Sequence, residues 1–245
     1  MKTLLIDIET SPHLVYTWGL FNQDITIDKI VEPSSVLCFS AKWLGEKGIQ
    51  FFSVQKDGEE SMLRAAWELL DEADVVMHYN GQNFDIPHLS RKFVLRGWGP
   101  PQPFVQIDLW RAVKKRFKFA SSKLDHVAQE LGLNGKVKHE GFDLWKLCMA
   151  GDAAAWRRME KYNRRDVAVL EEVYDLIKPW IPALPNRQLY DGVSGCPVCG
   201  ADTLQRRGFA YTKVSKFQQW LCTTCGSWSR SSTRSGGVKK QESVL

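Results

Sequence analysis

The chain has 245 residues, of which 44% are hydrophobic and 25% are charged, and this composition excludes a wholly disordered protein. No segment approaches the roughly 20 consecutive apolar residues that a membrane-spanning helix needs. The first ten residues, MKTLLIDIET, contain two carboxylates that interrupt any secretory apolar region. We therefore expect a cytoplasmic protein without a membrane partner.

The net charge of +5 is unevenly distributed along the chain. Residues 187–245 contain nine Lys/Arg and three Asp/Glu, a balance of +6, whereas residues 1–186 contain 24 and 25, a balance of −1. A basic C-terminal part suggests contact with a polyanion such as nucleic acid, although the same charge also serves solubility.

The first part of the chain is predicted to be a mixed α/β domain with a five-stranded sheet flanked by helices. Strands are predicted at Thr3–Glu9, Ser35–Trp43, Ile49–Val54, Val75–Tyr79 and Phe104–Ile107. The first three strands form a meander. The last two strands alternate along the chain with helices predicted at Glu59–Asp71 and Phe84–Leu95. Most of the remainder up to Ile177 has helical patterns.

The domain boundary is predicted where the last long helix ends. This helix, Ala153–Ile177, begins after a plausible N-cap at Asp152 and ends before Pro179. We therefore expect a first domain over residues 1–178, an extended proline-rich linker over 179–195 and a compact module over 196–226. Residues 227–245, rich in Ser, Gly, Arg and Lys, are predicted to be a disordered basic tail.

Two carboxylates stand at the end of the first predicted strand. Asp7 and Glu9 are two residues apart, so both point to the same face at the carboxyl end of the strand, where open α/β sheets bind ligands. Adjacent carboxylates repel each other, and a divalent cation between them removes that repulsion. The alternative is a pair of solvated acids at a strand end.

Two further motifs carry acids on predicted helices. Asp85 follows the stretch that begins with Asn80 and lies in the first turn of a helix, where an acid also serves helix capping. Tyr162 and Asp166 lie four residues apart on one face of the long helix, where they could also form a local hydrogen bond.

Together these motifs resemble the DEDD family of 3′→5′ exonucleases, whose domain has a ribonuclease-H-like fold. The similar stretches are Asp7–Thr10, Asn80–Asp85 and Tyr162–Asp166, and the second is most similar to the proofreading domain of family B DNA polymerases. The resemblance covers residues 1 to about 178. Because Tyr162 stands four residues before the last acid and Lys161 five before it, the chain resembles the tyrosine branch (DEDDy) and not the histidine branch.

The resemblance implies a two-metal phosphodiester hydrolysis with Mg²⁺ or Mn²⁺. In the family pattern Asp7 bridges both ions, Glu9 and Asp166 complete the ion on the nucleophile side, and Asp85 holds the other, largely through water. Tyr162 orients the attacking water. No histidine is then needed as a general base, so we interpret four of them as surface or hydrogen-bonded residues: His78, His88, His126 and His139.

Substrate contacts are predicted at four residues, which are Asn80, Phe84, Leu14 and Lys123. Phe84 and Leu14 could stack against terminal bases, although the pattern favours core residues for both. Lys123 belongs to a stretch, Ser122–Asp125, that is similar to a segment of the same family. The basic run from Lys114 to Lys118 could follow a phosphate backbone, or it could be a solvated helix face.

Four cysteines form two Cys-x-x-Cys-Gly knuckles separated by 22 residues. They are Cys196, Cys199, Cys222 and Cys225, and their spacing resembles a zinc ribbon with one structural Zn²⁺. A redox-active Cys-x-x-Cys pair is the alternative. Cations and aromatic residues between the knuckles suit nucleic acid, but they could also dock a protein or pack the module.

The sequence as a whole predicts a metal-dependent 3′→5′ exonuclease that acts on DNA 3′ ends, with the zinc ribbon aiding substrate or partner binding. A replication or repair protein is a candidate partner. An RNA exonuclease and a structure-selective endonuclease are alternatives on the same fold. A non-catalytic nucleic-acid-binding adaptor is the alternative from a different class.

Overall fold

The computed structural model describes residues 1–134, 141–192 and 194–237. These form two compact units, Lys2–Val173 and a second one that begins at Tyr174 and includes Met1. Within the described ranges no helix combines the length and the apolar character needed to span a bilayer. His139 and residues 238–245, for which the sequence made predictions, lie outside these ranges.

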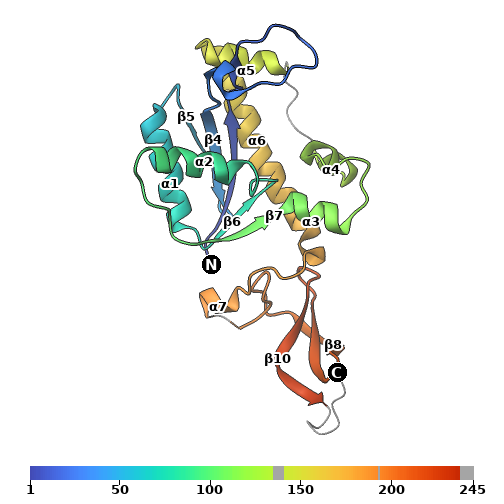
Figure 1. Cartoon of the computed structure of the whole chain (residues 1–245). Coiled ribbons are helices and arrows are strands. Elements are labelled where there is room, and N and C mark those ends of the chain that lie inside the picture. Colours follow the sequence, from blue (N-terminus) through green and yellow to red (C-terminus); the bar gives the residue numbers. More distant parts are fainter. Residues whose placement is uncertain (135–140, 193, 238–245) are drawn as a thin grey trace. The chain divides into compact units, whose positions relative to one another are not determined.

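The first unit is built on a five-stranded sheet of order β5-β4-β1-β6-β7 (Figure 1). Its strands are β1 (Thr3–Thr10), β4 (Val36–Trp43), β5 (Gln50–Ser53), β6 (Val75–His78) and β7 (Val105–Asp108). β1 pairs antiparallel with β4 and parallel with β6, so the sheet is mixed. The predicted α/β fold with a five-stranded sheet is thereby confirmed.

Helices cover both faces of this sheet because the central strands are apolar on both sides. The helices are α1 (Glu59–Glu72), α2 (Asp85–Leu95), α3 (Leu109–Arg116), α4 (Leu124–Glu130), α5 (Phe142–Met149) and α6 (Ala153–Ile177). Leu4, Ile6 and Ile8 of β1 pack with α1 and α2, whereas β4 and β5 pack with α5 and α6 on the other face. The predicted N-cap is confirmed, since Asp152 Oδ1 accepts the Ala155 N–H at 2.6 Å.

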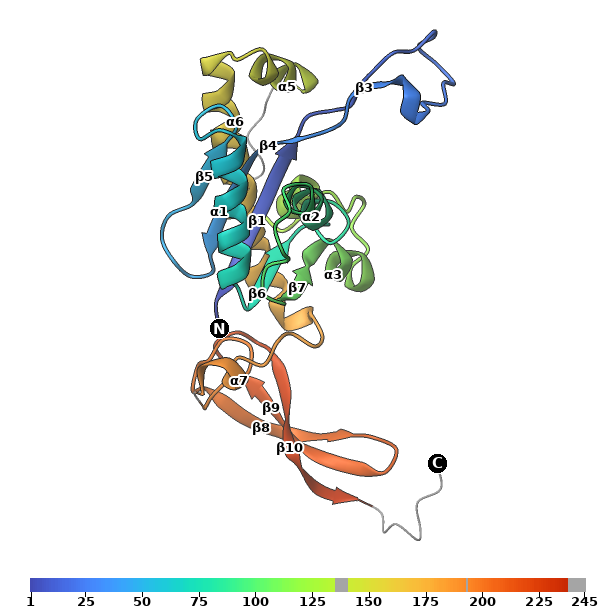
Figure 2. The same cartoon turned by 60° about the vertical axis from the view of Figure 1, so that its left-hand side comes forward.

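The segment between β1 and β4 forms an arm that the sequence did not predict. It contains the two-stranded pair β2 (Leu14–Val15) and β3 (Ile30–Glu32) and the short 3₁₀ helix η1 (Ile27–Lys29), and Figure 2 shows it extending away from the sheet. Large apolar side chains on this arm are exposed, among them Trp18 (98%), Leu20 (90%) and Phe21 (82%). The arm therefore has no core of its own.

The second unit contains a three-stranded antiparallel sheet of order β10-β9-β8. Its elements are the 3₁₀ helix η2 (Lys178–Trp180), α7 (Gln188–Asp191), β8 (Leu204–Tyr211), β9 (Ser215–Cys222) and β10 (Trp228–Gly237). The prediction of disorder from residue 227 onward is wrong as far as Gly237, because β10 pairs with β9 and thereby satisfies its backbone groups. The linker predicted to be extended likewise contains η2 and the helical turn α7.

Candidate active site

Three carboxylates from β1 and α6 meet at the face of the sheet that α6 covers. Asp7, Glu9 and Asp166 each offer an oxygen atom, and these atoms lie within 4.8 Å of one another. The strand period places Asp7 and Glu9 on one face, while Ile6 and Ile8 point into the core on the opposite face. The predicted juxtaposition of the first and third motifs is thus present in the fold.

Asn163 fixes the orientation of Asp7. This asparagine is fully buried in α6, and its Nδ2 donates to Asp7 Oδ2 at 2.7 Å and to the Asp7 carbonyl oxygen at 3.2 Å. The bond to the carboxylate is charge-assisted. The sequence analysis did not single out Asn163, although it lies within the third motif.

The electrostatic character of this face is visible in a neighbouring thiol. Cys38 lies directly opposite Glu9 in the register of β1 and β4, and it is fully buried. Burial raises the pKa of the Cys38 thiol well above its ordinary value, and the carboxylates of Glu9 and Asp7 raise it further. Negative charge is thus concentrated here, which is an environment that suits hard cations.

Asp85 is not among the three clustered carboxylates, although it bonds to the same strand, β1. Its Oδ1 accepts the N–H of Ile8 in β1 at 3.0 Å. Met77 is the last residue of β6 that pairs with β1, and the bond to Asp85 lies beyond this pair. The Asp85 side chain therefore joins the start of α2 to β1. Its role as a ligand of a second ion remains a prediction.

Burial raises the pKa of Asp85 from 3.8 to about 7, although the Ile8 N–H opposes this shift. The nearby His78 is also buried, and burial lowers its pKa. His78 Nδ1 accepts the Gly81 N–H at 3.0 Å, which leaves Nε2–H to donate to Gln106 Oε1, also at 3.0 Å. His78 is therefore a hydrogen-bonded core histidine.

The turn between β6 and α2 depends on close packing. Asn80 has a positive φ of 67°, and its N–H donates to Asp108 Oδ1 at 2.9 Å. At Gly81 a Cβ atom would lie 2.5 Å from His78 Cγ and 2.9 Å from Asp85 Oδ2. Only glycine fits at this position, because both neighbours are held by hydrogen bonds to the backbone.

A pocket of about 550 Å³ opens beside Asp7. Its lining residues are Asp7, Tyr79, Asn80, Trp110, Ser122, Lys123, Leu124, Asp125 and Tyr162. Tyr79 Oη donates to the Ser122 carbonyl oxygen at 2.7 Å and so links β6 to the segment before α4. Tyr162 packs edge-on against Trp145, with 6.0 Å between ring centroids. Tyr79 and Trp110 are lining residues that the sequence analysis missed.

The structure thus brings two of the four predicted substrate residues, Asn80 and Lys123, to this pocket. Phe84 and Leu14 do not line it. Phe84 is 39% exposed and packs against His88, and Leu14 is exposed on the arm, so neither is a core residue. The basic residues at the end of α3 are exposed, and Lys114 lies over the Trp110 ring at 4.3 Å.

The four cysteines of the second unit also converge. Their sulfur atoms lie within 4.8 Å of one another, and the Cys196–Cys225 and Cys199–Cys222 sulfur pairs are 3.6 and 3.7 Å apart. Thiolates bound at about 2.3 Å to one tetrahedral zinc ion lie about 3.8 Å from each other. Both short distances join one knuckle to the other, so the donor set and spacing fit a single shared metal ion.

The sequence matches the RNase_H superfamily over residues 4–178, and the chain therefore belongs to the RNase H superfamily. No curated protein matches the sequence. The fold is similar to that of a family B DNA polymerase from the hyperthermophilic archaeon Pyrobaculum calidifontis, with a TM-score of 0.56 and 18% sequence identity. This similarity covers 87% of the chain but 31% of the polymerase, and it concerns the fold alone.

Proposed function

We propose that the first unit is a metal-dependent 3′→5′ exonuclease of the tyrosine branch of the DEDD family. The observation that carries this proposal is the cluster of Asp7, Glu9 and Asp166 beside a pocket large enough for a nucleotide. Membership of the RNase H superfamily supports a nuclease, and the polymerase fold with a similar architecture supports DNA as its substrate.

The carboxylates fit divalent cations because they are hard oxygen donors gathered within a few ångströms. Asp7, Glu9 and Asp166 would hold Mg²⁺ or Mn²⁺, and Asp85 would contribute to a second ion. Bound there, the ions supply activation of a water molecule and stabilisation of the leaving 3′-oxygen. Asn163 would hold the Asp7 carboxylate in one orientation for this binding.

The remaining residues position the substrate. Tyr162 and Asp7 line the same pocket, which supports the proposed role of the phenol in orienting the attacking water. Lys123 and Asn80 line the pocket as well, and they contact the phosphate and sugar of the terminal nucleotide. Phe84 and Leu14, which are both exposed, remain the proposed contacts for terminal bases.

For the second unit we propose a zinc ribbon in which the four cysteines hold one structural Zn²⁺ and which helps to engage nucleic acid. The crosswise sulfur distances support one shared ion. All four ligand positions are filled by protein, so the ion has no open position for catalysis. A redox-active pair would use the two cysteines of one knuckle, whereas the short sulfur distances join one knuckle to the other.

The test is a product ladder from 5′-labelled single-stranded DNA, duplex DNA and RNA of one sequence, with Mg²⁺, with Mn²⁺ and without divalent ion. We expect stepwise shortening of DNA from the 3′ end that depends on the metal and is abolished in Asp7→Ala and Asp166→Ala. Preferred shortening of RNA would identify an RNA exonuclease, and internal cuts would identify an endonuclease. Intact strands in all reactions would overturn the proposal in favour of the adaptor.

A further inference from the structure

The sheet of the second unit carries a concentrated positive charge. Residues 204–237 contain six cations and no acidic residue, so the charge has no neutralising partner within the stretch. The cations are Arg206, Arg207, Lys213, Lys216, Arg230 and Arg234. Such a surface attracts polyanions more strongly at low salt than at high salt.

Aromatic rings and cations alternate on one face of β8 and β9. Arg206 lies directly opposite Trp220, with its guanidinium 5.4 Å from the indole centroid. Further along the two strands, Phe209 lies opposite Gln218 and Tyr211 lies opposite Lys216. The ammonium group of Lys216 is 4.8 Å from the centroid of the Phe209 ring. A bulge between Arg206 and Phe209 keeps both side chains on this face.

We call this surface the stacking face and define it by its residues, Arg206, Phe209, Tyr211, Lys216 and Trp220. Tyr211 is 74% exposed and Phe209 is 38% exposed, so both rings are accessible to a ligand. The opposite face of the same sheet carries Trp228, because Trp228 lies opposite Leu221, the neighbour of Trp220 in β9.

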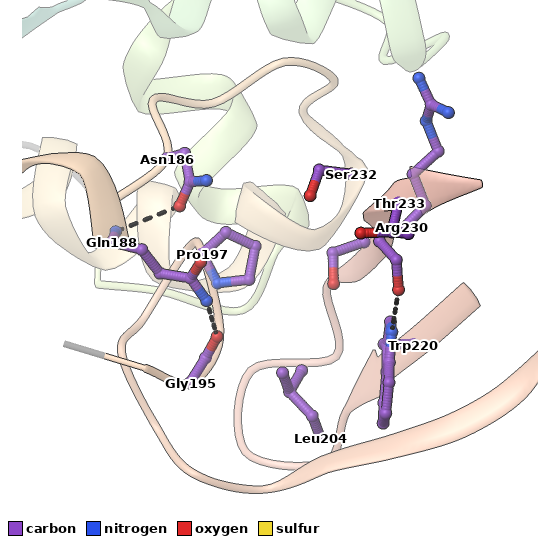
Figure 3. Close-up of a pocket in the computed structure, with 11 residues that line it drawn as sticks. Asn186, Gln188, Gly195, Pro197, Leu204, Trp220, Arg230, Ser232 and Thr233 are labelled. Carbon is purple, nitrogen blue, oxygen red and sulfur yellow. Dashed lines mark hydrogen bonds between the residues drawn. The ribbon is translucent and has the colours of Figure 1, made fainter. Parts of the chain in front are cut away.

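At the Trp220 end the stacking face leads into a pocket of about 500 Å³. Figure 3 shows Trp220 on one side of this pocket and the amides of Asn186 and Gln188 on the other. Trp220 Nε1 donates to Ser231 Oγ at 3.0 Å, which fixes the indole ring in the wall. The pocket thus combines a flat aromatic surface with amide and hydroxyl groups, which are the groups that recognise a nucleobase.

We propose that the stacking face binds single-stranded nucleic acid and that the pocket beside Trp220 takes one of its bases. Arg206 and Lys216 contact phosphates, while Phe209, Tyr211 and Trp220 stack with bases. This inference rests on the proposed role of the second unit in engaging nucleic acid, and it adds the strand type and the contact residues. It does not require that the chain hydrolyse what it binds.

The exposed rings favour a single strand over a duplex, because a duplex keeps its bases stacked on one another and offers mainly phosphates. The positive charge favours nucleic acid over a protein partner. Residues 204–237 carry six cations and no acidic residue, which suits a polyanion, and cations lie over two of the three rings on this face.

The experiment measures binding by the full-length chain in the Asp7→Asn background, so that the strand stays intact. We would record the fluorescence anisotropy of a labelled 20-nucleotide single strand, and of the matching duplex, over a series of salt concentrations. No chelator is added, because it would remove the zinc ion. We expect Trp220→Ala and Tyr211→Ala each to weaken single-strand binding by about tenfold and to change duplex binding little. Arg206→Gln should lower the slope of log Kd against log salt.

Trp228→Ala, on the opposite face, is the matched control, and it should leave single-strand affinity unchanged. Zinc content and the circular dichroism spectrum show that each variant keeps its fold, and Tyr211→Ala removes a ring that is largely exposed. Equal losses in Trp228→Ala and Tyr211→Ala, or unchanged affinity in both Trp220→Ala and Tyr211→Ala, would overturn the inference. So would the absence of single-strand binding by the parent chain. The product ladder tests hydrolysis separately.

Discussion

The side-chain amide of Asn163 bonds to both the carboxylate and the carbonyl oxygen of Asp7, and it thereby joins α6 to the centre of β1. Asn163→Ala should leave the Asp7 side chain free to rotate. We expect activity to fall by roughly 10- to 100-fold, with more Mg²⁺ needed for half-maximal rate. A metal titration of the initial rate, with thermal unfolding as the check on folding, measures this. An unchanged metal requirement would contradict the role of Asn163.

The buried carboxyl of Asp85 makes stability depend on pH when no divalent ion is present. Its pKa in the folded state, about 7, lies above the ordinary value of 3.8, so the folded protein holds an extra proton between these values. The contribution of Asp85 to the free energy of unfolding is therefore fully present below about pH 4, and this contribution is lost as the pH rises through 7.

Asp85→Asn removes this loss and keeps an acceptor for the Ile8 N–H. In magnesium-free urea denaturation the variant should be more stable than the parent at pH 8, by up to about 4 kcal/mol for a difference of some 3 pK units. The advantage should shrink toward pH 4. A difference that does not vary with pH would show that Asp85 does not titrate in this range.

Gly81→Ala should disrupt the turn between β6 and α2, because the added methyl group overlaps His78 and the carboxylate of Asp85. We expect destabilisation of about 2 kcal/mol or more and loss of nuclease activity. Gly99→Ala is the control, since no atom lies within 4 Å of a Cβ there. Chemical denaturation and the product ladder measure both effects, and equal stability of the two variants would refute the close packing.

Zinc analysis should find one ion per chain in the parent protein. Cys222→Ser should lose this ion together with the order of the second unit, because small modules depend on their metal for folding. Cys148→Ala, which changes a cysteine of α5 that is buried against β4 and α6, should retain it. A parent protein without zinc, or a Cys222→Ser variant that retains it, would contradict the shared site.

Local patterns predicted the elements whose formation depends on neighbours in the sequence. The apolar run of β1 and the strand period were enough to place Asp7 and Glu9 on one face. The partner of Asp7 could not be predicted in the same way. In the sequence, Asn163 is one of several polar residues on a long helix. Only the packing of this helix against the sheet shows that the Asn163 side chain is buried beside Asp7.

The composition of β10 misled the prediction for a related reason. Serine and arginine in Trp228–Gly237 offer little to bury, so the segment is similar to a solvated tail. Its order comes from β9, which supplies backbone partners that composition does not reveal. The arm of β2 and β3 was missed because its strands have only two and three residues.

The limited pairing of β1 with β6 has a mechanical consequence. The two strands pair only from Thr3 to Leu5, and beyond them the bond from Ile8 to Asp85 spans the gap. A displacement of α2 away from β1 would therefore break this bond and the apolar packing of Ile6 and Ile8 against α2, but no rung of the sheet. At the carboxyl end of β1 a side chain of α2 thus takes the place that β6 holds at the amino end, so the position of α2 relative to the carboxylates of β1 depends on the Asp85 carboxyl group.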